Sequence, residues 1–269
     1  MSGIEQKYIR NLAELRIPSG KDIMVGRMHI AEGKGPHPTI VMLHGFPGVM
    51  MNLDIAADLQ HNGWNVLVIS YRGAWGSKGC FSFSNALEDV RSTLEYIKRE
   101  EVADTNRIDR ERVALVGHSF GGFLALLTAV QDPSIKVIAS LSGANFGLFA
   151  NMAEQNPDME SQFRGILDDG CFFLNGCTAD IIIVEVMKNK DDWNTFIIAP
   201  ALADRRILLT ATTDDEELPK EHFHDPLVQI LEHADAKNLS HEVFESNHNY
   251  TNKRKELGQL LDRWLEENL

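Results

Sequence analysis

The pentapeptide GHSFG at residues 117–121 holds a serine, Ser119, between two glycines. The hydrophobic run RVALV before it predicts a buried strand, and the apolar stretch from Phe120 to Val130 after it predicts a buried helix. A serine on the sharp turn between such elements can project its hydroxyl above a sheet as a nucleophile. The alternative is a purely structural turn built from small residues. The strand–turn–helix context favours the nucleophile.

The chain also offers a base for this serine. A serine hydroxyl is a poor nucleophile unless a histidine accepts its proton, and that histidine needs a carboxylate to fix its tautomer. His248 lies between the last predicted strand and the last predicted helix, so we expect it at the same sheet edge as Ser119. The alternative for His248 is a surface-loop histidine, and His118, inside the turn, is expected only to pack. The other candidates fall on or beside a helix or at the start of a strand: His222, His224, His233 and His241.

Four consecutive acids, Asp214 to Glu217, follow the predicted strand RRILLTAT. They follow the last predicted strand but one, at the sheet edge where Ser119 and His248 are also expected, so one of them could be the carboxylate partner of the base. The four acids could also form no more than a solvated loop. At most one of them can point at His248, and chain position alone leaves that choice open.

A second glycine-containing turn, HGFPG at residues 44–48, follows the predicted strand PTIVML. Acyl transfer requires backbone N–H groups aimed at the oxygen on which negative charge develops. The N–H of Phe120, directly after the serine, is one candidate donor, and the N–H of Phe46 is the other. His44 is expected to brace this loop. The alternative is an ordinary Gly/Pro turn.

The elements that must position these groups alternate between strands and helices. Segments on either side of Ser19-Gly20 predict an opening antiparallel hairpin. Residues 84–101 have the apolar spacing of an amphipathic helix, with Ser84 as its expected cap. Further strand–helix pairs continue to the C-terminus. The pattern predicts an α/β fold with a mostly parallel central sheet and helices on both faces.

One region interrupts this alternation. About sixty residues, at 143–203, separate two predicted strands, far more than a typical connection. The segment is rich in aromatic and aliphatic residues, which a disordered insert would lack. We expect a single domain over residues 1–269 with a helical cap inserted at 143–203, over one edge of the sheet.

Composition and charge argue against several classes of protein. The formal net charge of −13 argues against a nucleic-acid partner. The apolar run near residues 113–130 is too polar in its middle to span a membrane, and the first residues lack the apolar core of a signal peptide. Three cysteines give no disulfide scaffold, and neither Cys171 and Cys177 nor His222 and His224 have the spacing of a metal site. A cytoplasmic protein of a reducing compartment is expected.

Five motifs appear together and in order: LHGFPG, SYRGAWGSKG, GHSFGG, TATTDDEELP and NHNYTNKRKEL. In this combination the chain resembles the bacterial α/β-hydrolases, in the branch close to dienelactone hydrolases and the catalytic domains of prolyl-oligopeptidase-like (S9) serine peptidases. Aligning the family's acid motif on Pro219 implies Asp215 as the acid, with Asp214 second. The resemblance of Tyr71–Gly79 to the family's site-entrance loop implies that Tyr71 and Trp75 line the pocket.

The expected activity is that of a serine hydrolase acting on a small carboxylic ester through an acyl-enzyme. Ser119 is the expected nucleophile, with His248 and Asp215 as base and acid; no metal or organic cofactor is expected. An S9-like peptidase or amidase acting on a short peptide is the alternative within the enzyme class, and small esters are preferred because no propeller domain accompanies the chain. A non-catalytic ligand-binding protein on the same fold is the alternative outside that class.

Overall fold

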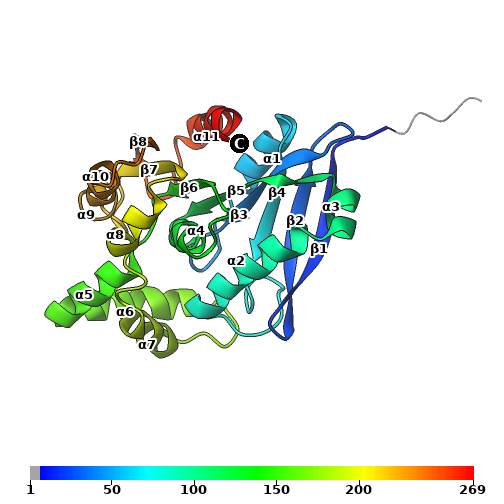
Figure 1. The fold of residues 1–269 in the computed structure, drawn as a ribbon. Helices are drawn as coiled ribbons and strands as arrows, with labels where there is room; N and C mark the ends of the chain where they lie inside the picture. The colour runs from blue at the N-terminus through cyan, green and yellow to red at the C-terminus, as the bar shows by residue number, and fades with distance from the viewer. Residues whose placement is uncertain (1–6) are drawn as a thin grey trace, which may run out of the picture.

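The computed structural model describes residues 7–269 (Figure 1). The expectation about a signal peptide falls partly on residues 1–6, which lie outside the described residues. One sheet runs through the molecule in the order β1-β2-β4-β3-β5-β6-β7-β8. β1 pairs with β2, and β2 with β4, in antiparallel fashion, and the strands from β4 to β8 in that order pair in parallel. The strands are β1 Asn11–Ser19, β2 Asp22–Ile30, β3 His37–Leu43, β4 Asn65–Ser70, β5 Ile108–His118, β6 Val137–Leu141, β7 Arg206–Asp214 and β8 Asn238–Asn247.

Helices cover both faces of the sheet. In Figure 1, α1 and α11 lie together on one face, and α2 and α4 lie on the other. The helices are α1 Leu53–His61, α2 Phe83–Ile97, α3 Glu100–Asn106, α4 Phe120–Gln131, α5 Phe146–Gln155, α6 Pro157–Cys171, α7 Ala179–Lys188, α8 Thr195–Ile198, the 3-10 helix η1 Ala199–Leu202, α9 Lys220–Phe223, α10 Asp225–His233 and α11 Arg254–Asn268. The predicted α/β architecture is confirmed. Among residues 7–269, no helix is long and apolar enough to cross a membrane.

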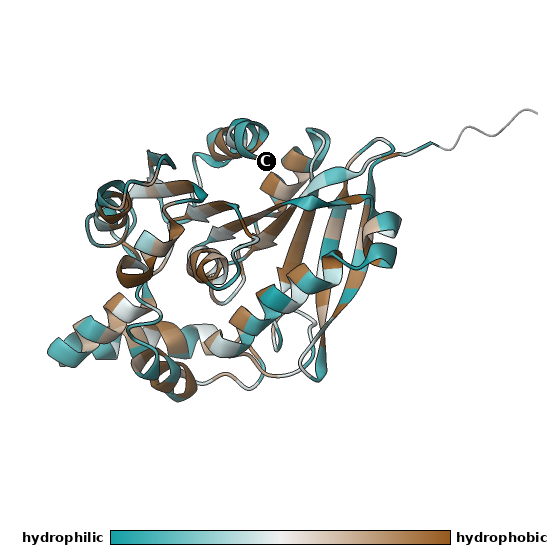
Figure 2. Cartoon of the chain, viewed as in Figure 1, coloured by the Kyte–Doolittle hydropathy of each residue, from teal (hydrophilic) through white to brown (hydrophobic). Residues whose placement is uncertain are grey.

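The continuous apolar runs of the central strands follow from this layering. Alternate side chains of a strand point to opposite faces, so a strand covered on both sides must be apolar at every position. In β3, Val41 and Leu43 enter the core beneath α2 and α4, whereas Ile40 and Met42 enter the core beneath α1 and α11. Figure 2 shows the central strands as predominantly hydrophobic. The sheet is therefore a rigid base for the loops at its carboxyl edge.

The helix predicted over residues 84–101 is two helices, and its cap was assigned to the wrong serine. α2 begins at Phe83, and the side chain of Ser82 accepts a hydrogen bond from the N–H of Asn85 at 3.1 Å. Ser84 lies inside the first turn. Phe83 is fully buried. We attribute the earlier start of the helix, one residue before Ser84, to the burial of this ring.

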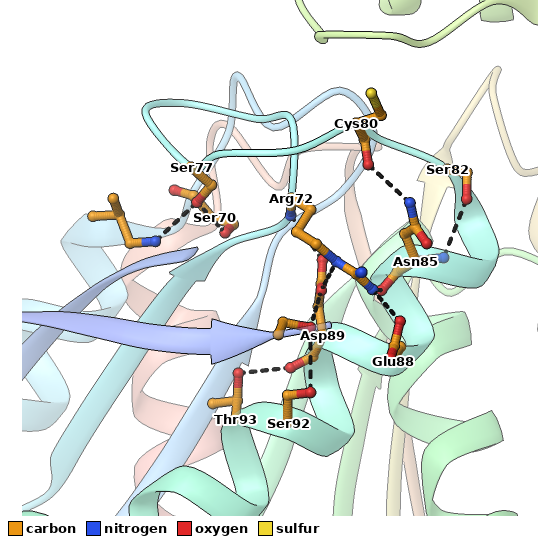
Figure 3. Close-up of polar contacts among 12 residues, drawn as sticks. Ser70, Arg72, Ser77, Cys80, Ser82, Asn85, Glu88, Asp89, Ser92 and Thr93 are labelled. Atoms are coloured by element: carbon orange, nitrogen blue, oxygen red, sulfur yellow. Dashed lines mark hydrogen bonds and ion pairs between the residues drawn. The ribbon is translucent and has the colours of Figure 1, made fainter. Parts of the chain in front are cut away.

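A buried ion pair fixes the loop that follows β4 (Figure 3). Arg72, at the start of this loop, donates from its backbone N–H and its Nε to the two carboxylate oxygens of Asp89 on α2, at 2.7 and 2.6 Å. The hydroxyl of Ser19, at the end of β1, donates to the same carboxylate at 2.6 Å. Arg72 also binds the more exposed carboxylate of Glu88. The hairpin, the loop and α2 are thus joined at one carboxylate.

Replacing Asp89 with alanine is expected to lower the free energy of unfolding by about 3–5 kcal/mol, because it leaves the Arg72 guanidinium buried without its main partner. Glu88→Ala is the matched control: the Glu88 side chain is 46% exposed, and a loss below about 1 kcal/mol is expected. Denaturant unfolding of both variants measures the difference. An Asp89→Ala loss no larger than that of Glu88→Ala would contradict this account.

The region between β6 and β7 is helical, and its role as a cap stays a prediction. It holds α5, α6, α7, α8 and η1, of which α5, α6 and α7 pack on one another (Figure 1). A disulfide joins Cys171, the last residue of α6, to Cys177. The three cysteines led us to expect no disulfide scaffold, and their number does not reveal which two sulfurs a short loop brings together. The cytoplasmic location stays a prediction, and the disulfide is more typical of oxidising compartments.

Candidate active site

The backbone of the turn after β5 departs from the ordinary range at Ser119. Its φ of 55° and ψ of −116° are rare for a residue with a side chain. A Cβ on Gly117 would lie 2.0 Å from the carbonyl oxygen of Gly121, and one on Gly121 would lie 2.1 Å from that of Leu43. Both glycines are therefore required for the turn to close against β3. This geometry holds Ser119 at the carboxyl edge of the sheet, in the middle of the parallel strands.

The acid loop and the histidine loop meet at the same edge. Nδ1 of His248, after β8, lies 2.7 Å from Oδ2 of Asp215, after β7. The other oxygen, Oδ1, accepts hydrogen bonds from the N–H groups of Glu217 and Leu218 at 3.1 and 2.8 Å. Asp214 is exposed at the end of β7. Of the two aspartates that the sequence left open, Asp215 is the one that the structure brings to His248.

Because a carboxylate only accepts hydrogen bonds, Nδ1 of His248 must donate to Asp215. The lone pair of the neutral imidazole is then on Nε2, which can take a proton from a neighbouring hydroxyl. His248 and Ser119 line one pocket of about 420 Å³. The pocket is lined by Gly45, Phe46, Pro47, Gly48, Val49, Met50, His118, Ser119, Ile166, Asp169, Gly170, Phe173, Glu217, His248 and Asn249.

The loop after β3 lies directly against the serine. A Cβ on Gly45 would be 3.1 Å from the Cβ of Ser119, so glycine allows the loop its close approach. Within residues 7–269, the N–H of Phe46 has no protein acceptor. The N–H of Phe120, in the first turn of α4, has no intrahelical acceptor. Two backbone donors near Ser119 are therefore free of acceptors within the described chain, and their role as an oxyanion hole stays a prediction.

The prediction that Tyr71 and Trp75 form pocket walls needs correction. Tyr71 is fully buried behind the pocket, and its hydroxyl donates to the carbonyl of His44 at 3.0 Å. Trp75 is 44% exposed; its Nε1 donates to the carbonyl of Pro47 at 2.8 Å, and its ring stacks on Phe173 with centroids 6.2 Å apart. In the described chain neither residue lines the pocket. Instead, both side chains bind carbonyls of the loop after β3, and Trp75 also packs on Phe173 of the pocket wall.

Several pocket residues were not identified from the sequence. Ile166, Asp169 and Phe173 come from α6 and the turn after it, within the helical region between β6 and β7. Oε2 of Glu217 lies 3.7 Å from Nε2 of His248. A Cβ on Gly170 would be 2.0 Å from the Phe46 ring, so α6 approaches that loop through a glycine. In the sequence, only the aromatic content of residues 143–203 indicated that this region could contribute to the pocket.

Comparison with known families identifies the fold. A family model described as "alpha/beta hydrolase fold" matches residues 38–177, just over half of the chain. The matched region includes the Ser119 turn and the loop of Phe46. The chain belongs to the alpha/beta hydrolase fold family.

Proteins similar to this α/β-hydrolase include an acylamino-acid-releasing enzyme in sequence, and an esterase and a peptidase among the solved structures. Acylamino-acid-releasing enzyme 1 of Oryza sativa subsp. japonica is 34% identical over 113 residues, covering 38% of this chain and 14% of that protein. Est1E from Butyrivibrio proteoclasticus superposes with a TM-score of 0.69 at 15% identity, covering 94% and 98% of the two chains. Pyrococcus horikoshii acylaminoacyl peptidase superposes with a TM-score of 0.68 at 17% identity, covering 98% and 42%.

These likenesses differ in what they establish. The α/β-hydrolase spans about half the length, or less, of the curated relatives it matches. The two solved structures, at 15% and 17% identity, establish the fold alone. The similarity to acylamino-acid-releasing enzymes nevertheless agrees with the S9 resemblance in the sequence motifs.

Two further histidines, His44 after β3 and His118 at the end of β5, are buried. Burial lowers the pKa of His44 to about 4 and that of His118 to about 3, so both are neutral at pH 7. Nδ1 of His44 lies 2.7 Å from the carbonyl oxygen of Gly45, which fits the expected brace of that loop. His118 does more than pack, since its Nε2 lies 2.9 Å from the carbonyl oxygen of His248.

Proposed function

We propose that this α/β-hydrolase is a serine hydrolase that cleaves small carboxylic esters through an acyl-enzyme intermediate. The observation that carries the proposal is the 2.7 Å contact between His248 and Asp215 in a site where His248 shares a pocket with Ser119. A histidine oriented by a carboxylate beside a strained serine is the arrangement that activates a hydroxyl for acyl transfer.

In the proposed mechanism, Oγ of Ser119 attacks the ester carbonyl carbon while Nε2 of His248 takes its proton. Asp215 stabilises the imidazolium that forms and keeps its orientation. The N–H groups of Phe46 and Phe120 stabilise the oxyanion of the tetrahedral intermediate. The intermediate expels the alcohol, which receives the proton from His248. Water, activated by the same imidazole, then releases the acid and regenerates the serine.

We also propose that residues 143–203 act as a cap that selects the acyl group. The pocket walls that this region contributes include the apolar side chains of Ile166 and Phe173, and the loop after β3 contributes Val49 and Met50. These four residues are at least 37% exposed, so they offer apolar surface to a bound molecule. Such walls favour an apolar acyl group or an aromatic ring over a charged one.

A peptidase is the second candidate, because the similarity to acylamino-acid-releasing enzyme 1 lies in the sequence itself. The two functions differ in the leaving group, since an amine leaves less readily than an alcohol and must be protonated as it departs. We expect turnover of p-nitrophenyl acetate and kcat/KM at least about 100-fold lower for acetyl-alanine p-nitroanilide. Steady-state assays of both substrates on the same preparation decide the question; faster cleavage of the anilide would replace the esterase by a peptidase.

A further inference from the structure

His118 occupies the variable position of the GxSxG pentapeptide, and the proposed chemistry does not use it. Its side chain is only 3% exposed. It lies between the nucleophile turn and the histidine loop, with its ring centroid 4.8 Å from that of His248. Its Nε2 lies 2.9 Å from the carbonyl oxygen of His248. The buried side chain of His118 thus contacts the backbone carbonyl of His248, the residue assigned as the base.

The direction of this hydrogen bond follows from its acceptor. A carbonyl oxygen cannot donate, so Nε2 of His118 must carry the proton. Nδ1 is buried and has no hydrogen-bond partner among the described residues. Burial lowers the pKa of His118 to about 3, so the ring is neutral over the working pH range. Its single ring proton is therefore held in one place, on the bond to His248.

Other contacts hold the residues that follow His248. Nη1 of Arg254, on α11, donates to the carbonyl of Asn249 at 3.2 Å. The hydroxyl of Tyr250 is buried with those of Ser142 and Thr210, at 2.9 and 2.7 Å. Asp215 holds the imidazole of His248. The backbone carbonyl of His248 is left to His118.

We propose that His118 is a positioning residue for the base: its hydrogen bond to the His248 carbonyl sets where the imidazole stands relative to Ser119. The inference rests on the proposed function. His118 and Ser119 are consecutive residues. The nucleophile and the side chain that binds the backbone of the base therefore belong to the same short segment. The relative placement of serine and imidazole then depends on few bonds, and displacement of a catalytic group by 1 Å can cost about 100-fold in rate.

Two substitutions test the proposal. His118→Leu keeps the bulk and removes the donor, and His118→Gln keeps an N–H donor near the position of Nε2. We expect His118→Leu to lower kcat for p-nitrophenyl acetate by about 10- to 100-fold with KM changed less than about 3-fold. His118→Gln should recover most of this loss. Labelling of Ser119 by a fluorophosphonate should slow in parallel, since it needs the same base.

The control variant is His29→Leu, which replaces another buried histidine, on β2, that does not line the pocket. Denaturant unfolding of all three variants shows whether a loss of kcat comes from lower stability of the fold or from displacement of the His248 imidazole. Folded His118→Leu protein with wild-type kcat would overturn the proposal, as would a kcat loss in His29→Leu equal to that in His118→Leu.

A measurement on the unmodified protein covers the case in which His118→Leu does not fold. The ¹⁵N resonances of the imidazole, assigned by comparison with His118→Gln, report which nitrogen carries the proton. The proposal requires Nε2–H with a bare Nδ1, and an Nδ1–H tautomer would overturn it. Wild-type protein that neither hydrolyses esters nor reacts with the fluorophosphonate, yet shows the Nε2–H tautomer, would instead overturn the proposed function.

Discussion

Asp215→Asn is expected to lower kcat for p-nitrophenyl acetate by about 10⁴-fold. The asparagine can keep one oxygen toward the N–H groups of Glu217 and Leu218, which now bind Oδ1 of Asp215. Its NH₂ group would then face Nδ1 of His248 in place of Oδ2. Two donors cannot pair, so the imidazole would favour the tautomer with its proton on Nε2. That tautomer cannot accept the proton of Ser119.

Asp214→Asn is the matched control, because it removes the same charge one residue away. Asp214 is exposed, and within residues 7–269 the carboxylate that pairs with Nδ1 of His248 is that of Asp215. We expect its kcat to stay within about 3-fold of wild type, since the charge of an exposed side chain acts through solvent of high dielectric constant. Steady-state kinetics of the two variants, with folding checked by circular dichroism, measure the contrast. Equal losses in both variants would remove Asp215 from the proposed role.

Ser119→Ala is expected to have a larger effect, with kcat lowered by about 10⁶-fold. The substitution removes a single oxygen and keeps the Cβ at the unusual φ of 55°, so the turn should retain its shape. Binding of a substrate analogue should survive, because the pocket walls are unchanged. Hydrolysis by Ser119→Ala at more than about 1% of the wild-type rate, after contaminating esterases are excluded, would show that another group is the nucleophile.

The architecture could be predicted because its causes are local in the sequence. Apolar runs such as residues 66–69 and 40–43 identify strands covered on both faces. Glycines at 117 and 121 identify a turn that no other residue would allow. The start of α2 was misplaced because tertiary burial of Phe83, which local pattern does not reveal, moved the cap to Ser82. The disulfide was missed for the same kind of reason.

The candidate site was predictable where chain order carries information. Ser119 and His248 follow different parallel strands, whose carboxyl ends must share one edge of the sheet. Tyr71 was assigned to the wrong surface because its position in a loop says nothing about which side of that loop faces the pocket; its hydroxyl turns inward to His44. Phe173 was not identified because it reaches the site only through the packing of α6.

Reaction of wild-type protein with a fluorophosphonate probe, followed by mass spectrometry of the proteolytic peptides, tests the central claim most directly. The account predicts one probe adduct per chain, on Ser119 in the peptide containing GHSFGG, with labelling lost in Ser119→Ala and slowed in Asp215→Asn. The phosphorus of the probe mimics the carbonyl carbon under attack, so labelling requires both the serine and its base. Folded protein that stays unlabelled, or that is labelled at another residue, would contradict the account.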